Sequence, residues 1–171
     1  MEVNERIVEE YIKTVKGWFY MTDISFKVPS NYSNIDILAY NPIENEYYDI
    51  EVKYRSAYVL PKKDIASNPG LQQFTNQFLR PERQEAIERI IGTNQKVKKV
   101  FVTTRKCFGK KNDVEKAFIN ILNEKGFPFV EVWYFEEIIR ELFEKTNEKG
   151  KYNTELMQTI RLIKTYLSST L

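Results

Sequence analysis

Asp36, Glu51 and Lys53 are the residues whose types and spacing could do chemistry. Asp36 lies in the apolar segment 35–40, and Glu51 and Lys53 lie two residues apart in the segment 47–54. If residues 41–46 form a hairpin loop centred between residues 43 and 44, Asp36 lies directly opposite Glu51, and a one-residue slip would separate the two acids. Two like charges in that arrangement destabilise a sheet. A bound cation, a raised pKa of one acid or the nearby Lys53 must then offset the repulsion.

The alternation of side chains along a strand adds a second constraint. Glu51 and Lys53 face one side of the strand, with Asp49 beside them, and the apolar residues of the segment face the other side. A divalent cation could bridge Asp36 and Glu51 and take the backbone carbonyl of Val52 as a further oxygen ligand. Without a metal, the same residues could form an exposed strand face with an ion pair between a carboxylate and Lys53.

A fourth acid comes from the amphipathic segment 3–16. On a helical wheel, Glu5 lies at the edge of the apolar stripe, Glu9 lies further round, and Glu10 faces solvent. We therefore expect Glu5 to be the acid of this helix that approaches the sheet.

The residue types that are missing narrow the chemistry further. The chain has no histidine and one cysteine, Cys107. These counts exclude Ser-His-Asp and Cys-His nucleophile pairs and zinc sites built from histidine or several cysteines. Any metal must be bound by oxygen ligands, which favours a hard cation such as Mg²⁺, Mn²⁺ or Ca²⁺. We expect Cys107 to pack as a small hydrophobic residue.

These residues need elements to position them. The pattern predicts helices at 3–16, 71–91, 113–125, 136–145 and 154–168, with Pro81 marking a break or the first turn of a second helix within 71–91. It predicts strands at 18–28, 35–40, 47–54, 98–104 and 129–135, with a turn at 30–34 and irregular structure at 55–70. This order, α-β-β-β-α-β-α-β-α-α, is typical of an α/β fold in which an antiparallel meander leads into parallel crossovers, and hence of a mixed sheet flanked by helices.

The charges are unevenly placed along the chain. The net charge is −4 over residues 1–60, +7 over residues 61–116 and −1 over residues 117–171. A basic cluster of this kind can neutralise phosphates even when the total charge is near zero, although scattered surface lysines give the same count. The composition, with 42% apolar and 29% charged residues, is typical of a globular protein, and we expect one domain over residues 1–171. The sequence has no apolar run long enough to cross a bilayer and no hydrophobic signal core. We therefore expect the protein in the cytoplasm and not in a membrane.

The arrangement resembles the PD-(D/E)XK, or restriction endonuclease-like, nuclease superfamily. The residues that carry the resemblance are Asp36 in Asn-Ile-Asp-Ile, the triplet Glu51-Val52-Lys53, and Glu5 in the first helix. The core of that superfamily is a helix, a three-strand meander, a helix and a further strand. Segment 4–18 and the run from Glu51 to Ser56 look most like archaeal Holliday-junction resolvases. Ile35 stands where the motif often has proline.

The resemblance implies a Mg²⁺- or Mn²⁺-dependent DNA endonuclease that is selective for junctions or branched DNA and acts as a homodimer. Asp36, Glu51 and the Val52 carbonyl would bind the metal, with Glu5 in contact through water. Lys53 would orient or help to deprotonate the attacking water and stabilise developing charge. Basic residues would contact DNA phosphates; the candidates are Arg55, Lys62, Lys63, Arg80, Arg83, Lys110 and Lys111. Gln72, Gln73 and Gln77 are candidates for the glutamine that some branches place on the helix after the triplet.

Two other functions remain open at this point. The chain could be a sequence-specific restriction-type endonuclease in which residues 55–116 read bases. It could also be a DNA-binding protein that kept the fold and lost catalysis.

Overall fold

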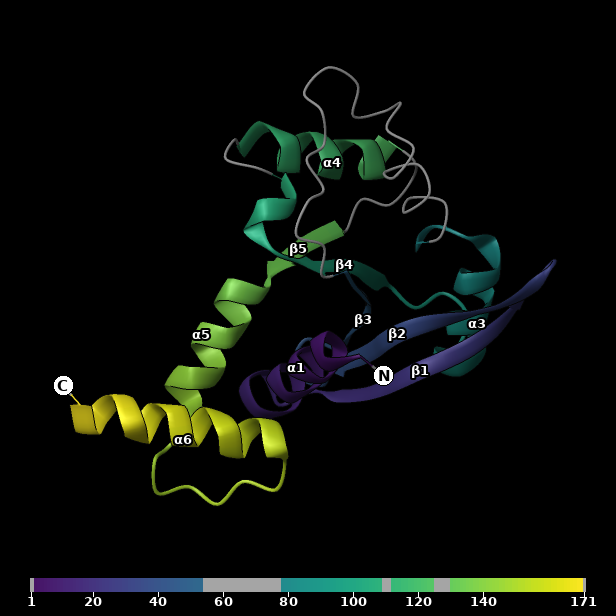
Figure 1. Cartoon of the computed structure of the whole chain (residues 1–171). Helices are drawn as coiled ribbons and strands as arrows, with labels where there is room; N and C mark the ends of the chain where they lie inside the picture. Colours follow the sequence, from purple (N-terminus) through teal and green to yellow (C-terminus); the bar gives the residue numbers. More distant parts are fainter. Residues whose placement is uncertain (1, 54–77, 109–111, 125–129, 171) are drawn as a thin grey trace.

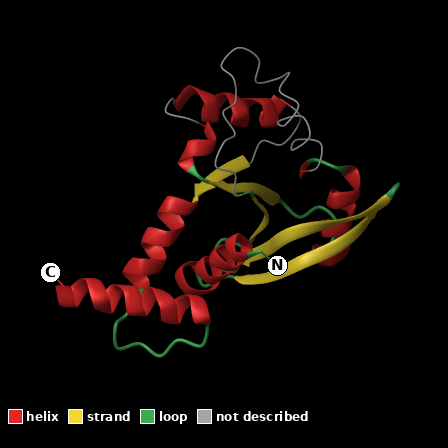
Figure 2. Ribbon diagram, viewed as in Figure 1, coloured by secondary structure: helices red, strands yellow, loops and turns green. Residues whose placement is uncertain are grey.

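The computed structural model describes residues 2–53, 78–108, 112–124 and 130–170 (Figure 1). Five strands form one mixed sheet in the order β1-β2-β3-β4-β5 (Figure 2). The strands are β1 (Phe19–Val28), β2 (Asn31–Asn41), β3 (Glu46–Val52), β4 (Val97–Thr103) and β5 (Val130–Tyr134). The first three strands pair antiparallel, whereas β4 lies parallel to both β3 and β5. The expected mixed sheet flanked by helices is confirmed.

The helices follow the expected order. They are α1 (Val3–Tyr11), which continues as the π-helix η1 (Ile12–Lys16), then α3 (Pro81–Ile91), the 3₁₀-helix η2 (Arg105–Phe108), α4 (Asn112–Glu124), α5 (Phe135–Lys145) and α6 (Glu155–Thr170). Pro81 is at the first turn of α3, where its missing N–H costs no hydrogen bond. The predicted segment 71–77 and the irregular segment 55–70 lie outside the described residues.

Local chemistry explains both ends of the first helix. Glu2 and Glu5 form a capping box at its start, with the Glu2 N–H donating to Glu5 Oε2 at 3.0 Å. At its end, Gly17 adopts the left-handed conformation with φ of 67°, and its N–H donates to the Ile12 carbonyl. The chain can therefore turn directly into β1.

The turn predicted at 30–34 is wrong. The strands β1 and β2 pair as far as Val28 opposite Asn31, so that only Pro29 and Ser30 form the turn. Asparagine and serine, which occur at residues 31, 33 and 34, are common in turns. Here residues 31–34 instead pair with β1 as part of the antiparallel sheet. Asn34 is held there by side-chain bonds, donating to Asp23 at 2.7 Å and accepting from Ser25 at 3.0 Å.

Helices cover the two faces of the sheet in different ways. One face is apolar; Ile37, Ile50 and Val102 pack there in a buried cluster with residues of α1, α5 and the start of α6. The opposite face packs on α3 near β1 and β2, and on α4 near β4 and β5. Cys107 is buried against α4, as expected of a small hydrophobic residue. Asp49 and Glu51 of β3 project from the face that α3 covers, where both contact Arg83.

Candidate active site

The hairpin between β2 and β3 has the register that the sequence predicts. Ile37 lies opposite Ile50, and the next position in the same register places Asp36 beside Glu51. The carboxylate of Asp36 also accepts a hydrogen bond at Oδ2 from the backbone N–H of Val52, at 2.7 Å. Asp36 therefore bonds to β3 through its side chain, at the point where the backbone pairing of the two strands ends.

Lys53 directly follows β3 and contacts Glu51. Its Nζ lies 2.8 Å from Glu51 Oε1, and its side chain is 32% exposed. Two hydrogen bonds to β4 hold the backbone of Lys53: its N–H donates to the Val102 carbonyl, and its carbonyl accepts from the Thr103 hydroxyl. Asp36, Glu51 and Lys53 are thus brought together, as the sequence predicts.

Arg83 is the feature of this site that sequence reasoning placed wrongly. We expected it on the surface in contact with DNA phosphates, but it is 2% exposed. Its Nη1 donates to Glu51 Oε2 at 2.7 Å, and its Nε and Nη2 donate to the two oxygens of Asp49 at 3.0 and 2.6 Å. Each of its three nitrogens is used inside the protein, so Arg83 binds carboxylates of β3 instead of DNA.

A signal for this placement was present in the sequence. Ala86, Ile87, Ile90 and Ile91 follow Arg83 at the spacings i+3, i+4, i+7 and i+8, which puts Arg83 on the apolar stripe of α3. A buried arginine on such a stripe needs a carboxylate partner. Asp49, which alternation places on the face of Glu51, was the acid to pair with it.

Asp49 is fully buried and satisfied by two cations. Lys99 Nζ lies 2.6 Å from Asp49 Oδ2 and also donates to Gln84 on α3. Burial alone would raise the pKa of Asp49, but the charges of Arg83 and Lys99 outweigh that effect and hold the pKa below its usual range. Asp49 is therefore a structural anion and is not free to bind a metal.

Asp36 is in the opposite electrostatic situation. Burial and the adjacent charge of Glu51 raise the pKa of Asp36 to about 7, although the Val52 N–H and the charges of Lys53 and Arg83 work to lower it. Burial would lower the pKa of Lys53, but Glu51 and Asp36 raise it overall, so its ammonium stays charged at neutral pH. The predicted repulsion between the two acids is thus met by a raised pKa and by two cations, Lys53 and Arg83.

The structure shows no direct bond between Glu5 and Asp36 or Glu51, and the expected contact of Glu5 with the metal through water stays a prediction. The helix α1 packs on the apolar face of the sheet, whereas Asp36 and Glu51 belong to the face that α3 covers. The side chain of Glu5 accepts from Glu2 in the capping box, and the charges that shift the pKa of Asp36 come from Glu51, Lys53 and Arg83. Glu10 was expected to face solvent, but it is 9% exposed and accepts from Thr14.

The other predicted DNA contacts are mostly beyond the described part of the chain. Arg55, Lys62, Lys63, Gln72, Gln73, Gln77, Lys110 and Lys111 lie outside the described residues. Arg80 is half-buried at the residue before α3. Within the described residues, part of the basic middle region pairs with acids of the first third: Lys98 with Glu46 at 2.6 Å, in addition to Arg83 and Lys99.

The residues present suit a hard cation with few protein ligands. Among the described residues, no group of three or more acidic or cysteine side chains has the arrangement of a metal site. Asp36 and Glu51 still offer two carboxylates on neighbouring strands. Mg²⁺ is commonly held by one or two carboxylates together with water and substrate phosphates. The pair fits that mode and does not fit a cation that needs a complete protein cage.

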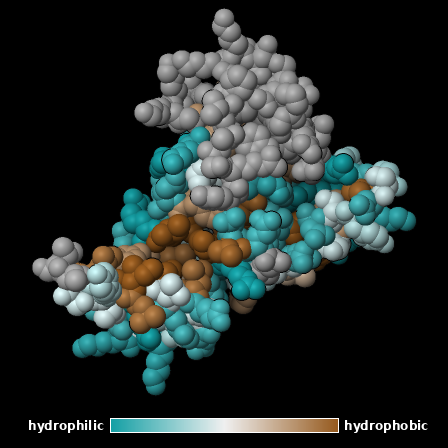
Figure 3. All heavy atoms as spheres, in the orientation of Figure 1, coloured by the Kyte–Doolittle hydropathy of each residue, from teal (hydrophilic) through white to brown (hydrophobic). Residues whose placement is uncertain are grey.

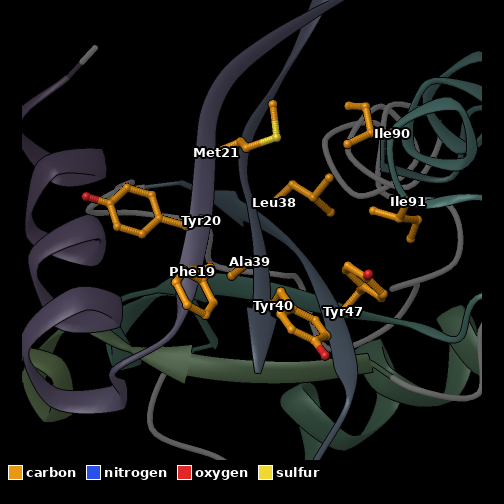
Figure 4. A pocket seen from close by; sticks show the side chains of 9 residues that line it. All are labelled: Phe19, Tyr20, Met21, Leu38, Ala39, Tyr40, Tyr47, Ile90 and Ile91. Carbon is orange, nitrogen blue, oxygen red and sulfur yellow. The ribbon is translucent and has the colours of Figure 1, made fainter. Parts of the chain in front are cut away.

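An apolar cavity lies further along the same face of the sheet (Figure 4). Its volume is about 280 Å³ and its lining is uncharged, formed by Phe19, Tyr20, Met21, Leu38, Ala39, Tyr40, Tyr47, Ile90 and Ile91. Tyr40 is four residues from Asp36 on β2, which corresponds to roughly 14 Å along a strand. Since neither a carboxylate nor a cation lines it, this cavity adds nothing to the carboxylate site.

Comparison with protein-family models, with curated proteins and with solved structures finds no match. No helix within the described residues is long and apolar enough to cross a bilayer.

Proposed function

We propose that this chain is a metal-dependent DNA endonuclease of the PD-(D/E)XK type. The observation that carries the proposal is the joint placement of Asp36, Glu51 and Lys53 at one point of the sheet, with Lys53 Nζ 2.8 Å from Glu51. The elements that hold them support it. The order α1, the meander β1–β3, α3 and β4 is the order that the resemblance implies for the nuclease core.

Each residue would have a distinct role in phosphodiester hydrolysis. Asp36 and Glu51, with the Val52 carbonyl, would hold Mg²⁺ or Mn²⁺, which when bound lowers the pKa of a water ligand and supplies positive charge for the phosphate. Lys53, as a charged ammonium at neutral pH, would donate hydrogen bonds to the attacking water or to a phosphate oxygen. Arg83 would keep Glu51 in place from inside the protein.

Selectivity for branched DNA and a homodimeric state are part of the same proposal. Within the described residues, α6 offers an apolar surface on which a second copy could pack. Leu162, Ile163, Tyr166 and Leu167 are between 44% and 66% exposed, and the intervening Lys164 turns its Nζ to the Thr146 carbonyl at 2.7 Å. Figure 3 shows apolar residues gathered over α5 and α6 on this face of the molecule.

A second candidate is a DNA-binding protein without catalysis. The specific observation in its favour is that both oxygens of Glu51 already contact cations, Oε1 with Lys53 and Oε2 with Arg83. A carboxylate that is satisfied by two side chains gains less from a metal. In that protein, the cluster would only stabilise the sheet.

A DNA cleavage assay on several substrates distinguishes the proposed nuclease from the non-catalytic DNA-binding protein. The full chain is incubated with supercoiled plasmid, linear duplex, single-stranded DNA and a four-way junction, with Mn²⁺, with Mg²⁺ and with EDTA. We expect metal-dependent cleavage that is strongest on the junction. Discrete fragments from linear duplex would indicate a restriction-type enzyme instead. Binding of the junction without cleavage in either metal would support the second candidate.

A further inference from the structure

The two cations that contact Glu51 are held very differently. Arg83 is anchored from several sides: it is 2% exposed, makes two bonds to Asp49 and one to Glu51, and its guanidinium lies 5.2 Å from the ring centre of Phe78. Breaking a buried pair of this kind leaves an uncompensated charge and is strongly destabilising. Arg83 therefore cannot leave Glu51 without disturbing the whole α3 contact.

Lys53 has the opposite character. Its side chain is 32% exposed, and within the described residues its ammonium makes one ion pair, with Glu51 Oε1 at 2.8 Å. An ion pair that reaches water is weak, because the solvent screens it. Its backbone is fixed by β4 through two hydrogen bonds, so the side chain can swing away while the strand stays in place.

We propose that Glu51 has one permanent cation and one exchangeable cation: Arg83 fixes Oε2, and Lys53 occupies Oε1 until a divalent cation is bound there. This inference rests on the proposed function, because it concerns the same metal site. Its consequence is that Lys53 competes with the metal. The residue that stabilises charge during cleavage is also the residue that must leave Glu51 before the site is loaded.

The competition has a signature that a merely structural lysine would not show. Removing the Lys53 ammonium should make the metal bind more tightly, although a catalytic lysine is lost. We expect the dissociation constant for Mn²⁺ to fall about twofold to fivefold in Lys53→Met, which at tenfold per 1.4 kcal/mol corresponds to the energy of an exposed ion pair. Lys53→Gln should show the same direction, which guards against a folding defect specific to methionine.

Isothermal titration of the full chain with Mn²⁺ alone, without DNA, tests this. Lys98→Met is the matched control, because Lys98 pairs with Glu46 at 2.6 Å elsewhere on the sheet and its removal changes the net charge equally. We expect Lys98→Met to bind Mn²⁺ as the parent does, and Asp36→Asn to bind it far more weakly.

The outcomes are distinct. Tighter binding in both Lys53 variants but not in Lys98→Met supports the inference. Equal or weaker binding in the Lys53 variants, beside a parent that binds, overturns it and leaves the proposed function standing. A parent that does not bind Mn²⁺ at millimolar concentration, or an Asp36→Asn variant that binds like the parent, overturns the metal site of the proposed function itself.

Discussion

At the residue scale, the neighbouring acids Asp36 and Glu51 have different electrostatic surroundings. Glu51 lies between two cations, with Arg83 at 2.7 Å and Lys53 at 2.8 Å. Within the described residues, Asp36 accepts from one backbone N–H, that of Val52, and its pKa is raised to about 7 by burial and by Glu51. An added cation would therefore stabilise the anion of Asp36.

Asp36→Asn should stabilise the protein at alkaline pH. Because the folded pKa of Asp36 is raised to about 7, the native state binds more protons than the unfolded state between about pH 4 and pH 7, and this group makes the free energy of unfolding fall as the pH rises through that window. The amide of asparagine is uncharged at every pH, so the variant avoids the free-energy cost of burying a charged carboxylate beside Glu51. We expect Asn to add about 1–2 kcal/mol at pH 8, and much less at pH 5.

Urea unfolding of both proteins at the two pH values measures this difference. The amide oxygen can still accept from the Val52 N–H, so the substitution removes the charge and keeps the hydrogen bond. A variant that is less stable than the parent by the same amount at pH 5 and pH 8 would contradict the raised pKa.

Arg83→Met, on α3, should be among the most destabilising single changes in the protein. It leaves Asp49 fully buried with only Lys99 as a counter-charge and frees Glu51 Oε2. The expected loss is about 3–5 kcal/mol in the free energy of unfolding. Arg89→Met, on the same helix, is the matched control, because the Arg89–Glu85 pair is exposed and should contribute less than about 0.5 kcal/mol. Similar losses in the two variants would show that the buried network adds no stability.

At the element scale, the predictions succeeded where a local pattern and the tertiary structure favoured the same arrangement. The strand alternation around Glu51 and the loop at 41–46 were enough to give the register of β2 and β3, because one face of the hairpin is apolar and a slip would expose it. The turn at 30–34 failed because cross-strand pairing outweighed local turn preference. Arg83 was misplaced because its charge was weighed more heavily than its position on the apolar stripe of α3.

The junction between α1 and β1 depends on one residue. An added Cβ at Gly17 would meet nothing within 4 Å, so the only cost of a side chain there comes from the φ of 67°. Gly17→Ala should lower the free energy of unfolding by about 1–2 kcal/mol. Gly17→Asn should lose less, because asparagine tolerates this conformation. Thermal unfolding of the three proteins checks the order, and an alanine variant as stable as the parent would exclude a left-handed Gly17.

At the scale of the whole molecule, the acidic and basic segments of the sequence partly neutralise each other through ion pairs in the folded protein. The first third, at −4, and the middle, at +7, meet where β3 lies beside β4 and beneath α3, and Glu46, Asp49 and Glu51 each pair there with a lysine or arginine. The pairing of strands far apart in sequence decided this, and composition alone did not show it. Lys98, Lys99 and Arg83 therefore pair with acids of β3, so the proposed function would need its DNA contacts from other basic residues.

The central claim is that Asp36, Glu51 and Lys53 form a metal-dependent nuclease site, and nicking of supercoiled plasmid in Mn²⁺ tests it most directly. Parent, Asp36→Asn and Lys53→Met proteins are compared at equal concentration, with Lys98→Met as the control and circular dichroism to confirm folding. We predict cleavage by the parent and the control, at least about 100-fold slower cleavage by the two site variants, and none in EDTA. Cleavage by both folded site variants at the parent's rate, or cleavage that persists in EDTA, would contradict the account.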